Sequence, residues 1–452
     1  MTECSAQLCL GFHPQLAVRL AFDAPEVSSD GGVVLLRQVD EQLGLTAGFA
    51  GCLPDERDPV RVVHSRHEQS RQRIFQIALG YEDCNDADAL RRDPLLKTVC
   101  DRTPDDPEGL SSQPTLSRFE NAPDGVTLRR LVRWLESSYV ESLPADTEVV
   151  ILDIDATDDE THGAQQLSFF HGFFDHHIYH PLLVYDGDSG QLISALLRPG
   201  NTHASRGAIG TLRRIIRRLK RRLPQVLIVV RGDAGFAMPR LMAALERLNE
   251  QHGGIDYLFG IAKNPRLRRL AEPEMLWAEE LFERSTDTVR RFTSFHYAAR
   301  SWPHPRRIIA KAEHSARGPN PRFVVTTLEG FDPETIYHAY IQRGLCEHWI
   351  KDFKCAVAAD RLSCSRFAAN CFRLLLHAAA YRLLHALRLQ AARTSAELGR
   401  AQFDTLRLRL LKVAALVRRS ARCIWVRLPR VYPWQRAFAW LAAQMNSPPL
   451  PA

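Results

Sequence analysis

Two short apolar runs that lead into aspartates constrain this fold more than any other feature. The run Val149–Asp155 reads VVILDID, and the run Val226–Val230 continues through Arg231 and Gly232 to Asp233. Aliphatic runs of this length are typical of strands buried on both faces of a helix-covered sheet. Open α/β sheets carry their active sites at the carboxyl ends of the central strands. We therefore expect an α/β fold that brings acidic side chains to one edge of its sheet.

The neighbouring segments complete this sheet. Strand patterns follow the first run, and a helix, the second run, another helix and a last strand come after them. These segments are Leu167–Phe174, His180–Asp186, Gln191–Leu197, a basic helix at 205–222, a helix at 238–251 and the strand Tyr257–Ile261. Successive strands followed by alternating helix and strand predict a ribonuclease-H-like core. We expect its first part at residues 145–264 and its completion at residues 333–392.

Three further regions surround or interrupt this core. Residues 265–332 have the pattern of antiparallel strands between Pro, Gly and Asn turns, which predicts an inserted β-rich subdomain. The expected strands are Thr288–Ala298, Arg307–Ala312 and Arg322–Thr327. Residues 1–140 have helical periodicity and turn-rich acidic stretches, so we predict a helical N-terminal domain. Residues 393–452 are rich in arginine, and we expect a basic helical C-terminal region there.

Charge and cysteine usage narrow the classes of function. The chain has 59 Lys and Arg against 52 Asp and Glu, a net charge of +7, and basic stretches at Arg213–Arg222, Arg266–Arg269 and Arg393–Arg422. Guanidinium groups suit bidentate contacts to phosphate, although each stretch is equally explained as a solvated helix face. The ten cysteines include no C-x-x-C pair, which argues against a zinc finger. No segment has a signal-peptide or membrane-spanning pattern, so we expect a cytoplasmic protein with free thiols.

The first apolar run offers two candidate acids. Strand alternation puts Asp153 and Asp155 on one face and the aliphatic side chains between them on the other. Burying a carboxylate at the end of an apolar strand is unfavourable unless a cation or a donor compensates. Asp155 lies at the end of its run, as Asp233 does, so we select Asp155 and Asp233 and keep Asp153 as the alternative.

A helix predicted at 334–358 supplies the third acid. At about 100° per residue, Glu347 shares one stripe with basic or phenolic side chains, namely Tyr340, Arg343, Lys351 and Lys354. Ile341, Leu345, Trp349 and Phe353 fall on the other side, where we expect them to pack on the sheet. Asp155, Asp233 and Glu347 would hold a pair of Mg²⁺ or Mn²⁺ ions for phosphoryl transfer, because both ions prefer carboxylate oxygens. The basic stripe would position a DNA backbone.

These residues resemble the DDE transposases of bacterial insertion sequences, in the branch with a β-rich insertion ahead of the glutamate. Tyr340-x2-Arg343-x3-Glu347-x6-Lys354 matches the Y-x2-R-x3-E-x6-K signature of that branch. Ile154–Thr157 (IDAT) and Arg231–Phe236 (RGDAGF) resemble the segments around its two aspartates. The likeness covers most of residues 20–390, and it includes Ser28–Gly32, Leu197–His203 and Ala359–Cys364.

The resemblance implies cleavage at terminal inverted repeats and attack of the freed 3′-hydroxyl on target DNA. It implies a homodimer or larger synaptic complex on double-stranded DNA, with the N-terminal domain recognising the terminal repeat. Tyr340, Arg343 and Lys354 would contact phosphates near the element end. Arg198, Asn201 and His203, on the loop after Gln191–Leu197, would be their neighbours.

Three alternatives to a transposase remain open. A ribonuclease-H-like nuclease would cut DNA without joining it, and a transposase-derived DNA-binding protein would have lost catalysis. A zinc or iron hydrolase would instead use the histidines that gather between the two apolar runs. These histidines are His162, His171, His176, His177 and His180.

Overall fold

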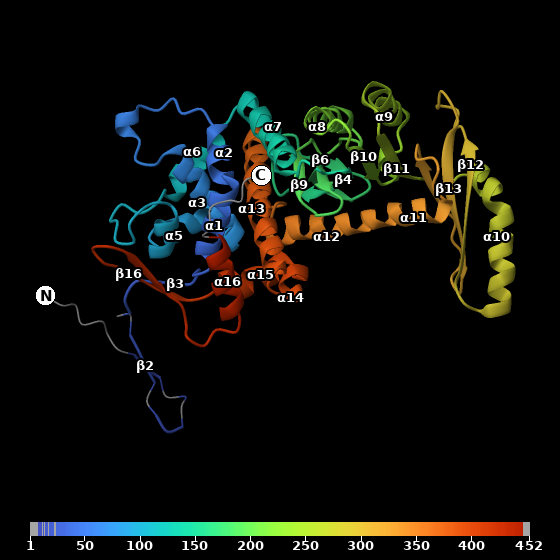
Figure 1. Cartoon of the computed structure of the whole chain (residues 1–452). Coiled ribbons are helices and arrows are strands. Elements are labelled where there is room, and N and C mark those ends of the chain that lie inside the picture. Colours follow the sequence, from blue (N-terminus) through green and yellow to red (C-terminus); the bar gives the residue numbers. More distant parts are fainter. Residues whose placement is uncertain (1–7, 11, 13, 17, 22–23, 446–452) are drawn as a thin grey trace. The chain divides into compact units, whose positions relative to one another are not determined.

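The computed structural model describes residues 8–10, 12, 14–16, 18–21 and 24–445, and these residues form two compact units. The first unit combines the described parts of Met1–Gly51, Asp55–Phe119 and Ala386–Leu450, and the second contains Cys52–Pro54 and Glu120–His385. The candidate acids all belong to the second unit, which is coloured from cyan to orange in Figure 1. Within the described residues, no helix has the length and apolar character needed to cross a membrane.

One nine-stranded sheet of described residues organises the second unit. Its order is β12-β13-β15-β11-β10-β4-β8-β9, and β14 pairs with β13. β4, β10 and β11 are parallel neighbours in the middle, and the other neighbouring pairs are antiparallel. The strands are β4 (Val149–Ala156), β8 (Leu182–Asp186), β9 (Leu192–Leu196), β10 (Leu227–Gly232), β11 (Ile255–Ile261), β12 (Val289–Tyr297), β13 (Arg306–Ser315), β14 (Gly318–Pro319) and β15 (Arg322–Thr326). The predicted mixed α/β architecture is therefore present.

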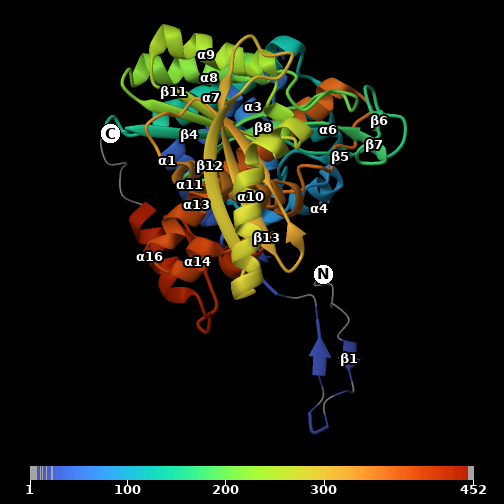
Figure 2. The ribbon, with the colours of Figure 1, turned by 90° about the vertical axis from the view of Figure 1, so that its right-hand side faces the viewer.

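Helices cover one face of the sheet. They are α7 (Gly125–Ser142), α8 (Ala208–Arg222) and α9 (Pro239–His252), and Figure 1 and Figure 2 both show them on the same side of the strands. Strand alternation turns Val150, Leu152 and Ile154 toward this layer, where they join the apolar stripe of α8 in one buried cluster. Asp153 and Asp155 therefore face the other side of the sheet.

α7 corrects the predicted end of the N-terminal domain. We placed that domain at residues 1–140, but α7 packs against β9 and α8, and Glu120–His385 belongs to the second unit. The physical reason is the apolar stripe of α7, because Leu131, Leu135 and Tyr139 are buried. A helix that carries such a stripe packs wherever an apolar face is available, and the helical pattern alone does not identify that face.

The predicted insertion extends the main sheet. The expected antiparallel strands are present as β12, β13 and β15, but β15 pairs with β11, so they continue the core sheet instead of forming a sheet of their own. They cover the edge of β11, which would otherwise present unpaired backbone groups. α10 (Pro265–Ser285) packs on β12 and β13, as Figure 2 shows, and we did not predict this helix, which contains Pro273.

The segment that carries Glu347 is helical but not one uniform α-helix. It consists of α11 (Pro333–Ile341), a 3-10 turn (Gln342–Gly344), α12 (Leu345–Lys351) and a π-helical turn (Asp352–Ala356). Figure 1 shows α11 and α12 following one another along the face of the sheet opposite α8 and α9. The segment then leads to α13 (Phe367–Ala392).

The predicted apolar side of this segment is only half right. Trp349 and Phe353 are buried, but Ile341 is 46% exposed and Leu345 is 44% exposed. Residues spaced by four drift about 40° per step around a helix. A run of four such residues therefore spreads over a wide arc, and only its last two members reach the core.

The first unit is mainly helical and holds two small sheets. Its helices are α1 (Val33–Leu43), α2 (Leu45–Gly51), α3 (Arg66–Leu79), α4 (Ala87–Leu90), α5 (Pro94–Val99), most of α6 (Gln113–Asn121), α14 (Ala396–Arg400), α15 (Phe403–Leu406) and α16 (Gln435–Met445). Its strands are β1 (Leu8–Leu10), β2 (Val18–Leu20), β3 (Val27–Ser28), β16 (Ala415–Arg419) and β17 (Ile424–Arg427). The C-terminal region that we expected to be basic and helical contains α14, α15 and α16 and also a hairpin, because β16 pairs with β17 as well as with β3.

Candidate active site

Asp155 and Asp233 lie at the carboxyl ends of two adjacent parallel strands. β4 and β10 pair Asp153 with Arg231 and Ile154 with Gly232, so the next step in this register brings Asp155 level with Asp233. The carboxylate of Asp155 accepts a hydrogen bond from the backbone N–H of Ala156 at 2.8 Å. Asp233 accepts one from Gly235 at 2.9 Å and caps the turn Ala234–Phe236. The two acids therefore occupy one edge of the sheet.

Asp153 is engaged in a closed ion pair. Arg231 donates to its two carboxylate oxygens at 2.6 and 2.7 Å, and Asp153 is fully buried. A bidentate guanidinium satisfies a carboxylate on its own. Asp155 is thus the acid of β4 whose carboxylate is left for other partners.

Arg343 links Asp155 to the glutamate of the helical segment. Its Nη2 lies 3.4 Å from Oδ2 of Asp155, and its Nη1 lies 3.9 Å from Oε1 of Glu347. The Glu347 side chain is 73% exposed. The Nε of Arg343 is buried without a hydrogen-bond partner among the described residues. The guanidinium therefore bridges two acids loosely and keeps one unsatisfied donor.

The site concentrates negative charge around Asp155. Burial raises the pKa of Asp155 to about 6, Arg343 opposes this rise, and the charges of Asp233 and Glu347 add to it. A divalent cation would relieve this repulsion, and carboxylate oxygens are the ligands that hard cations prefer. The chemistry of the donor set therefore fits Mg²⁺ or Mn²⁺.

The described side chains are not gathered into a metal cage. Among the residues that the structure describes, no three or more His, Cys, Asp or Glu side chains are close enough to hold a metal ion. This finding covers the histidines as well as the acids. His180 bonds the carbonyl of Thr202 at 2.7 Å, and burial lowers the pKa of His180 to about 4. In this structure Arg343, rather than a converged set of ligands, connects Asp155 and Glu347.

The phenol of Tyr340 lies against the end of β11. A Cβ added to Gly260 would meet the hydroxyl oxygen of Tyr340 at 2.5 Å, so only glycine leaves room for this phenol. Burial raises the pKa of Tyr340, and the charges of Asp233 and Asp155 add to the rise against the opposing charge of Arg343. Tyr340 is therefore a neutral hydrogen-bonding group beside the acids.

The two lysines of the stripe differ in their surroundings. Lys354 lies 3.0 Å from Oδ1 of Asp158 and also bonds the carbonyl of that residue. Lys351 is exposed, and the described residues offer it no carboxylate within ion-pair distance. Lys354 lies within the π-helical turn, whose residue spacing differs from the α-helical spacing assumed for the predicted stripe.

The surroundings of Arg198 differ from the phosphate contact that we predicted for it. Arg198 is 4% exposed, and among the described residues its guanidinium donates to backbone carbonyls alone, those of His180, Pro181, His203, Ala204 and Arg206. The guanidinium holds the loop in shape and is not presented to solvent. Asn201 and His203, from the same predicted group, are exposed.

The loop that carries Asn201 and His203 lies beside the Asp233 turn. The Cβ of Ala204 is 3.2 Å from the position that a Cβ on Gly235 would take. His203 also lines a cavity of about 680 Å³, together with Arg206 and Arg240. Neither arginine was a sequence-based candidate. The only signal for Arg240 was its place in the first turn of the helix that follows Asp233.

The protein is of the mixed α/β class, and its candidate site consists of acidic side chains at the ends of two adjacent parallel strands. A family model described as "Transposase DDE domain group 1" matches residues 12–449. The chain therefore belongs to this family of DDE transposases.

Other comparisons add little. A solved chain from "piggyBac transposase synaptic complex with hairpin DNA" is 10% identical, with a TM-score of 0.42, over 93% of this chain and 82% of that chain. Comparison with curated proteins found no match.

Proposed function

We propose that this chain is an active DDE transposase, which cleaves DNA at insertion-sequence ends and joins the 3′-hydroxyl to target DNA. One observation carries the proposal. Asp155 and Asp233 end adjacent parallel strands, and Arg343 connects Asp155 to Glu347 of the signature motif. Membership of the DDE family supports the same set of three acids.

The core that presents these acids is, in our proposal, ribonuclease-H-like. Five consecutive strands have the order β9-β8-β4-β10-β11, in which β8 is antiparallel to both neighbours and β10 and β11 run parallel to β4. This arrangement supports the predicted core. We therefore treat the strands from β12 onward as an extension of that core.

Asp155, Asp233 and Glu347 would hold two metal ions, Mg²⁺ or Mn²⁺, because both ions prefer carboxylate oxygens. Such ions, when bound, supply the charge that stabilises the attacking and leaving oxygens of phosphoryl transfer. Glu347 is exposed and lies on a separate segment from the two aspartates. Its carboxylate therefore has freedom to approach Asp155 when DNA binds.

Arg343 would change partners during this approach. It bridges Asp155 and Glu347 loosely and has a buried unsatisfied Nε, so it can exchange carboxylates for a DNA phosphate. The phenolic O–H of Tyr340 would donate a hydrogen bond to a neighbouring phosphate. Lys351 and Lys354 would extend the contact along the backbone.

Asn201 and His203 would contact DNA from the loop beside the Asp233 turn, with Arg206 and Arg240 in the adjoining cavity. We further propose a homodimer or larger synaptic complex that holds terminal inverted repeats and target DNA. Two element ends must be held together for joining, and such an assembly would hold them.

Alanine at Asp233 tests the proposal. The assay supplies Mg²⁺, a donor duplex with a 3′-hydroxyl end and a supercoiled target, and it separates joined products from nicked products. Asp233→Ala should abolish joining, whereas Asp287→Ala, which changes an exposed aspartate outside the site, should preserve it. Joining that survives in Asp233→Ala contradicts the proposal.

The wild-type products distinguish the remaining alternatives. Nicks without joined products would favour a nuclease, and binding without any cleavage would favour a protein that has lost catalysis. Activity in Zn²⁺ alone would favour the histidine-based hydrolase.

A further inference from the structure

A cavity lined by arginines lies between the helices that cover the sheet. It has a volume of about 590 Å³ and opens between α7, α8 and α9. Figure 1 shows these three helices side by side above the strands. The lining residues, which we call the arginine cavity, are Arg133, Arg214, Arg217, Arg218, Arg221, Gln251 and His252.

The arginine cavity lies away from the candidate active site. α9 begins shortly after Asp233 and ends at His252, just before β11 starts at Ile255. Arg221 stands near the end of α8, which leads into the start of β10. The cavity is therefore at the amino-terminal edge of the parallel strands, whereas Asp155 and Asp233 are at the carboxyl edge.

Two of the arginines are held by one buried acid. Glu136 of α7 is fully buried, and it accepts hydrogen bonds from Arg214 at 2.6 Å and from Arg218 at 2.8 Å. Ser194 of β9 donates to the same carboxylate at 3.2 Å. Glu136 fixes these two guanidinium groups of the lining, and one carboxylate charge is shared between two arginines.

The other three arginines carry unbalanced charge. Arg133, Arg217 and Arg221 are exposed, and none has a carboxylate of a described residue within 4.0 Å. The described lining contains no acidic side chain. Arg214, Arg217, Arg218 and Arg221 recur on one face of α8, opposite its buried apolar stripe. The stripe is therefore more than an ordinary solvated face, because exposed basic faces usually alternate with acids.

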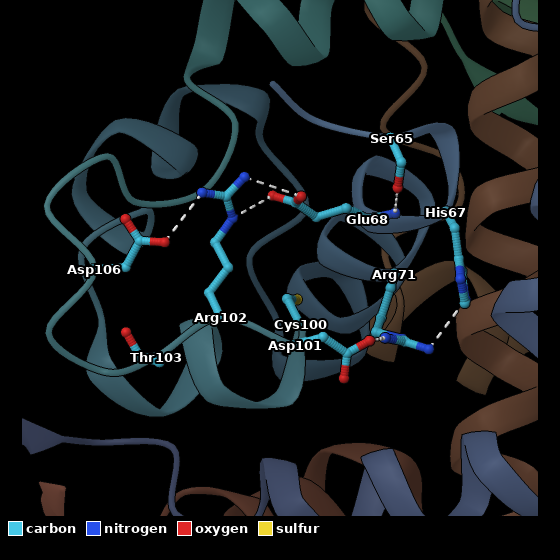
Figure 3. A pocket seen from close by; sticks show the side chains of 9 residues that line it. All are labelled: Ser65, His67, Glu68, Arg71, Cys100, Asp101, Arg102, Thr103 and Asp106. Atoms are coloured by element: carbon cyan, nitrogen blue, oxygen red, sulfur yellow. Dashed lines mark hydrogen bonds and ion pairs between the residues drawn. The ribbon is translucent and has the colours of Figure 1, made fainter. Parts of the chain in front are cut away.

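A cavity in the first unit shows the contrast. It has a volume of about 420 Å³, and Figure 3 shows its arginines pointing at carboxylates. Arg71 is paired with Asp101, and Arg102 lies 2.9 Å from Glu68 and 3.2 Å from Asp106. Those guanidinium groups are neutralised within the protein. In the arginine cavity, Glu136 pairs with Arg214 and Arg218 only, so the charges of Arg133, Arg217 and Arg221 are available to an external anion.

We propose that the arginine cavity binds the phosphate backbone of duplex DNA independently of sequence. The choice of DNA as the polyanion rests on the proposed function. From Arg214 to Arg221 the helix advances about 10 Å, at about 1.5 Å per residue. Duplex DNA advances about 3.4 Å per phosphate on each strand, so the stripe spans several successive phosphates. Its length fits a backbone better than a single phosphate group.

Because the cavity is at the opposite edge from the acids, this contact holds DNA that is not being cut at that moment. Such a contact carries no base-specific information, since arginine to phosphate reads charge and position only. It would bind flanking or target DNA beyond the reacting bond. One duplex would have to pass across the second unit to reach both edges of the sheet. Alternatively, a separate duplex could bind at each edge.

Salt dependence of binding tests the proposal. The protein is mixed with a duplex of random sequence in EDTA, so that neither metal binding nor catalysis contributes. The variant Arg133→Ala/Arg217→Ala/Arg221→Ala keeps Arg214 and Arg218, which hold Glu136. Each lost phosphate contact should reduce the slope of log K against log salt by about 0.9, so the triple variant should have a slope shallower by about 2 to 3.

A charge-matched control separates the cavity from net charge. Arg269→Ala/Arg300→Ala/Arg317→Ala removes the same charge from exposed positions that do not line the cavity and do not lie on its helices. The proposal is overturned if both triple variants change the slope equally, or if neither changes it. Replacing the three cavity arginines by lysine should restore most of the slope, and unfolding curves should coincide for all variants.

Two further measurements identify the ligand and separate the cavity proposal from the proposed function. Inorganic tripolyphosphate should compete with duplex only at concentrations where it screens as a salt, and tight stoichiometric binding of tripolyphosphate would overturn the duplex assignment. The binding assay does not depend on Asp233. An unchanged slope in the cavity variant therefore contradicts only the proposal that the arginine cavity binds DNA. Joining that survives Asp233→Ala contradicts the proposed function alone.

Discussion

Asp153 and Asp155 lie two residues apart on β4, and each is paired with an arginine. The two pairs differ in geometry and in burial. Arg231 and Asp153 form a bidentate pair at 2.6 and 2.7 Å, in which both side chains are buried. Arg343 and Asp155 make one contact of 3.4 Å, and Arg343 is shared with the exposed Glu347. The first pair is complete within the protein, whereas the second leaves room and charge for other partners.

The difference shows how one strand can serve structure and function together. A buried ion pair with ideal geometry is destabilising to break, because the remaining charge is left uncompensated. An open pair at the strand end is weak, so a metal ion or a phosphate can replace it at small free-energy cost. We expect substitutions at the two aspartates to separate stability from activity.

The largest expected effect is on catalysis at the open pair. Asp155→Asn keeps the shape of the side chain but removes its charge, so metal binding and joining should fall together. A metal contributes several kcal/mol to the transition state, which predicts a loss of at least about a thousand-fold in the joining rate. The rate is measured with the donor duplex and supercoiled target, and a variant that retains near wild-type joining would remove Asp155 from the site.

The closed pair should respond in stability instead. Asp153→Ala leaves Arg231 buried without its partner, and we expect a loss of about 3 to 5 kcal/mol in the free energy of unfolding. Denaturant unfolding measures the loss, with Asp287→Ala as the control at an exposed aspartate. If Asp153→Ala were as stable as the wild type but inactive, the roles of the two aspartates would be reversed.

The open pair should contribute one part of the pH dependence of stability. Burial raises the pKa of Asp155 to about 6 in the folded protein. The folded state then binds the proton more tightly than the unfolded chain, whose aspartates have a pKa of about 3.9, so stability falls as pH rises between these values. The stabilisation is fully present below about pH 4 and is lost through about pH 6, at most about 3 kcal/mol.

This pH effect is measured in EDTA by comparing unfolding free energies of wild type and Asp155→Asn from pH 4 to pH 7. The variant has no titrating group at this position, so its advantage over the wild type should grow as pH rises. Equal pH slopes for both proteins would show that another group causes the dependence.

The smallest expected effect concerns Arg343 itself. Arg343→Gln removes a positive charge from between Asp155 and Glu347, so Mn²⁺ should bind severalfold more tightly, by about 1 kcal/mol at this partly exposed site. Calorimetry of Mn²⁺ binding without DNA measures this change apart from activity. Arg290→Gln, at an exposed arginine outside the site, is the matched control. Weaker Mn²⁺ binding in Arg343→Gln would contradict the open-pair description.

Sequence patterns predicted the elements that have strong local signals. The apolar runs became β4 and β10, the basic amphipathic segment became α8, and the strands at 288–327 are present as β12, β13 and β15. Elements with mixed signals were missed. The prolines at 265 and 273 concealed α10, and a high arginine content concealed the hairpin of β16 and β17.

The sequence indicates which residues form the candidate site better than it indicates which groups surround them. Alternation in β4 identifies the face shared by Asp153 and Asp155, but only the pairing of β4 with β10 sets Arg231 beside Asp153. The loop motif around Arg198 suggests a phosphate contact, but the folded loop surrounds this guanidinium with five carbonyls. Arg231 is distant from Asp153 in the chain, and the carbonyls around Arg198 depend on how its loop folds, so periodicity contains no information about either set of partners.

The sequence by itself determined the acidic strand ends, the stripe around Glu347 and the excess of arginine on α8, because each depends on spacing along one strand or helix. The tertiary structure decided which aspartate is open, where α7 belongs and which arginines are neutralised. These outcomes depend on which side chain meets which across the sheet and between helices. A carboxylate paired with a buried guanidinium is structural, whereas the carboxylate two residues further along, with one long contact to Arg343 and two other acids nearby, is available for chemistry.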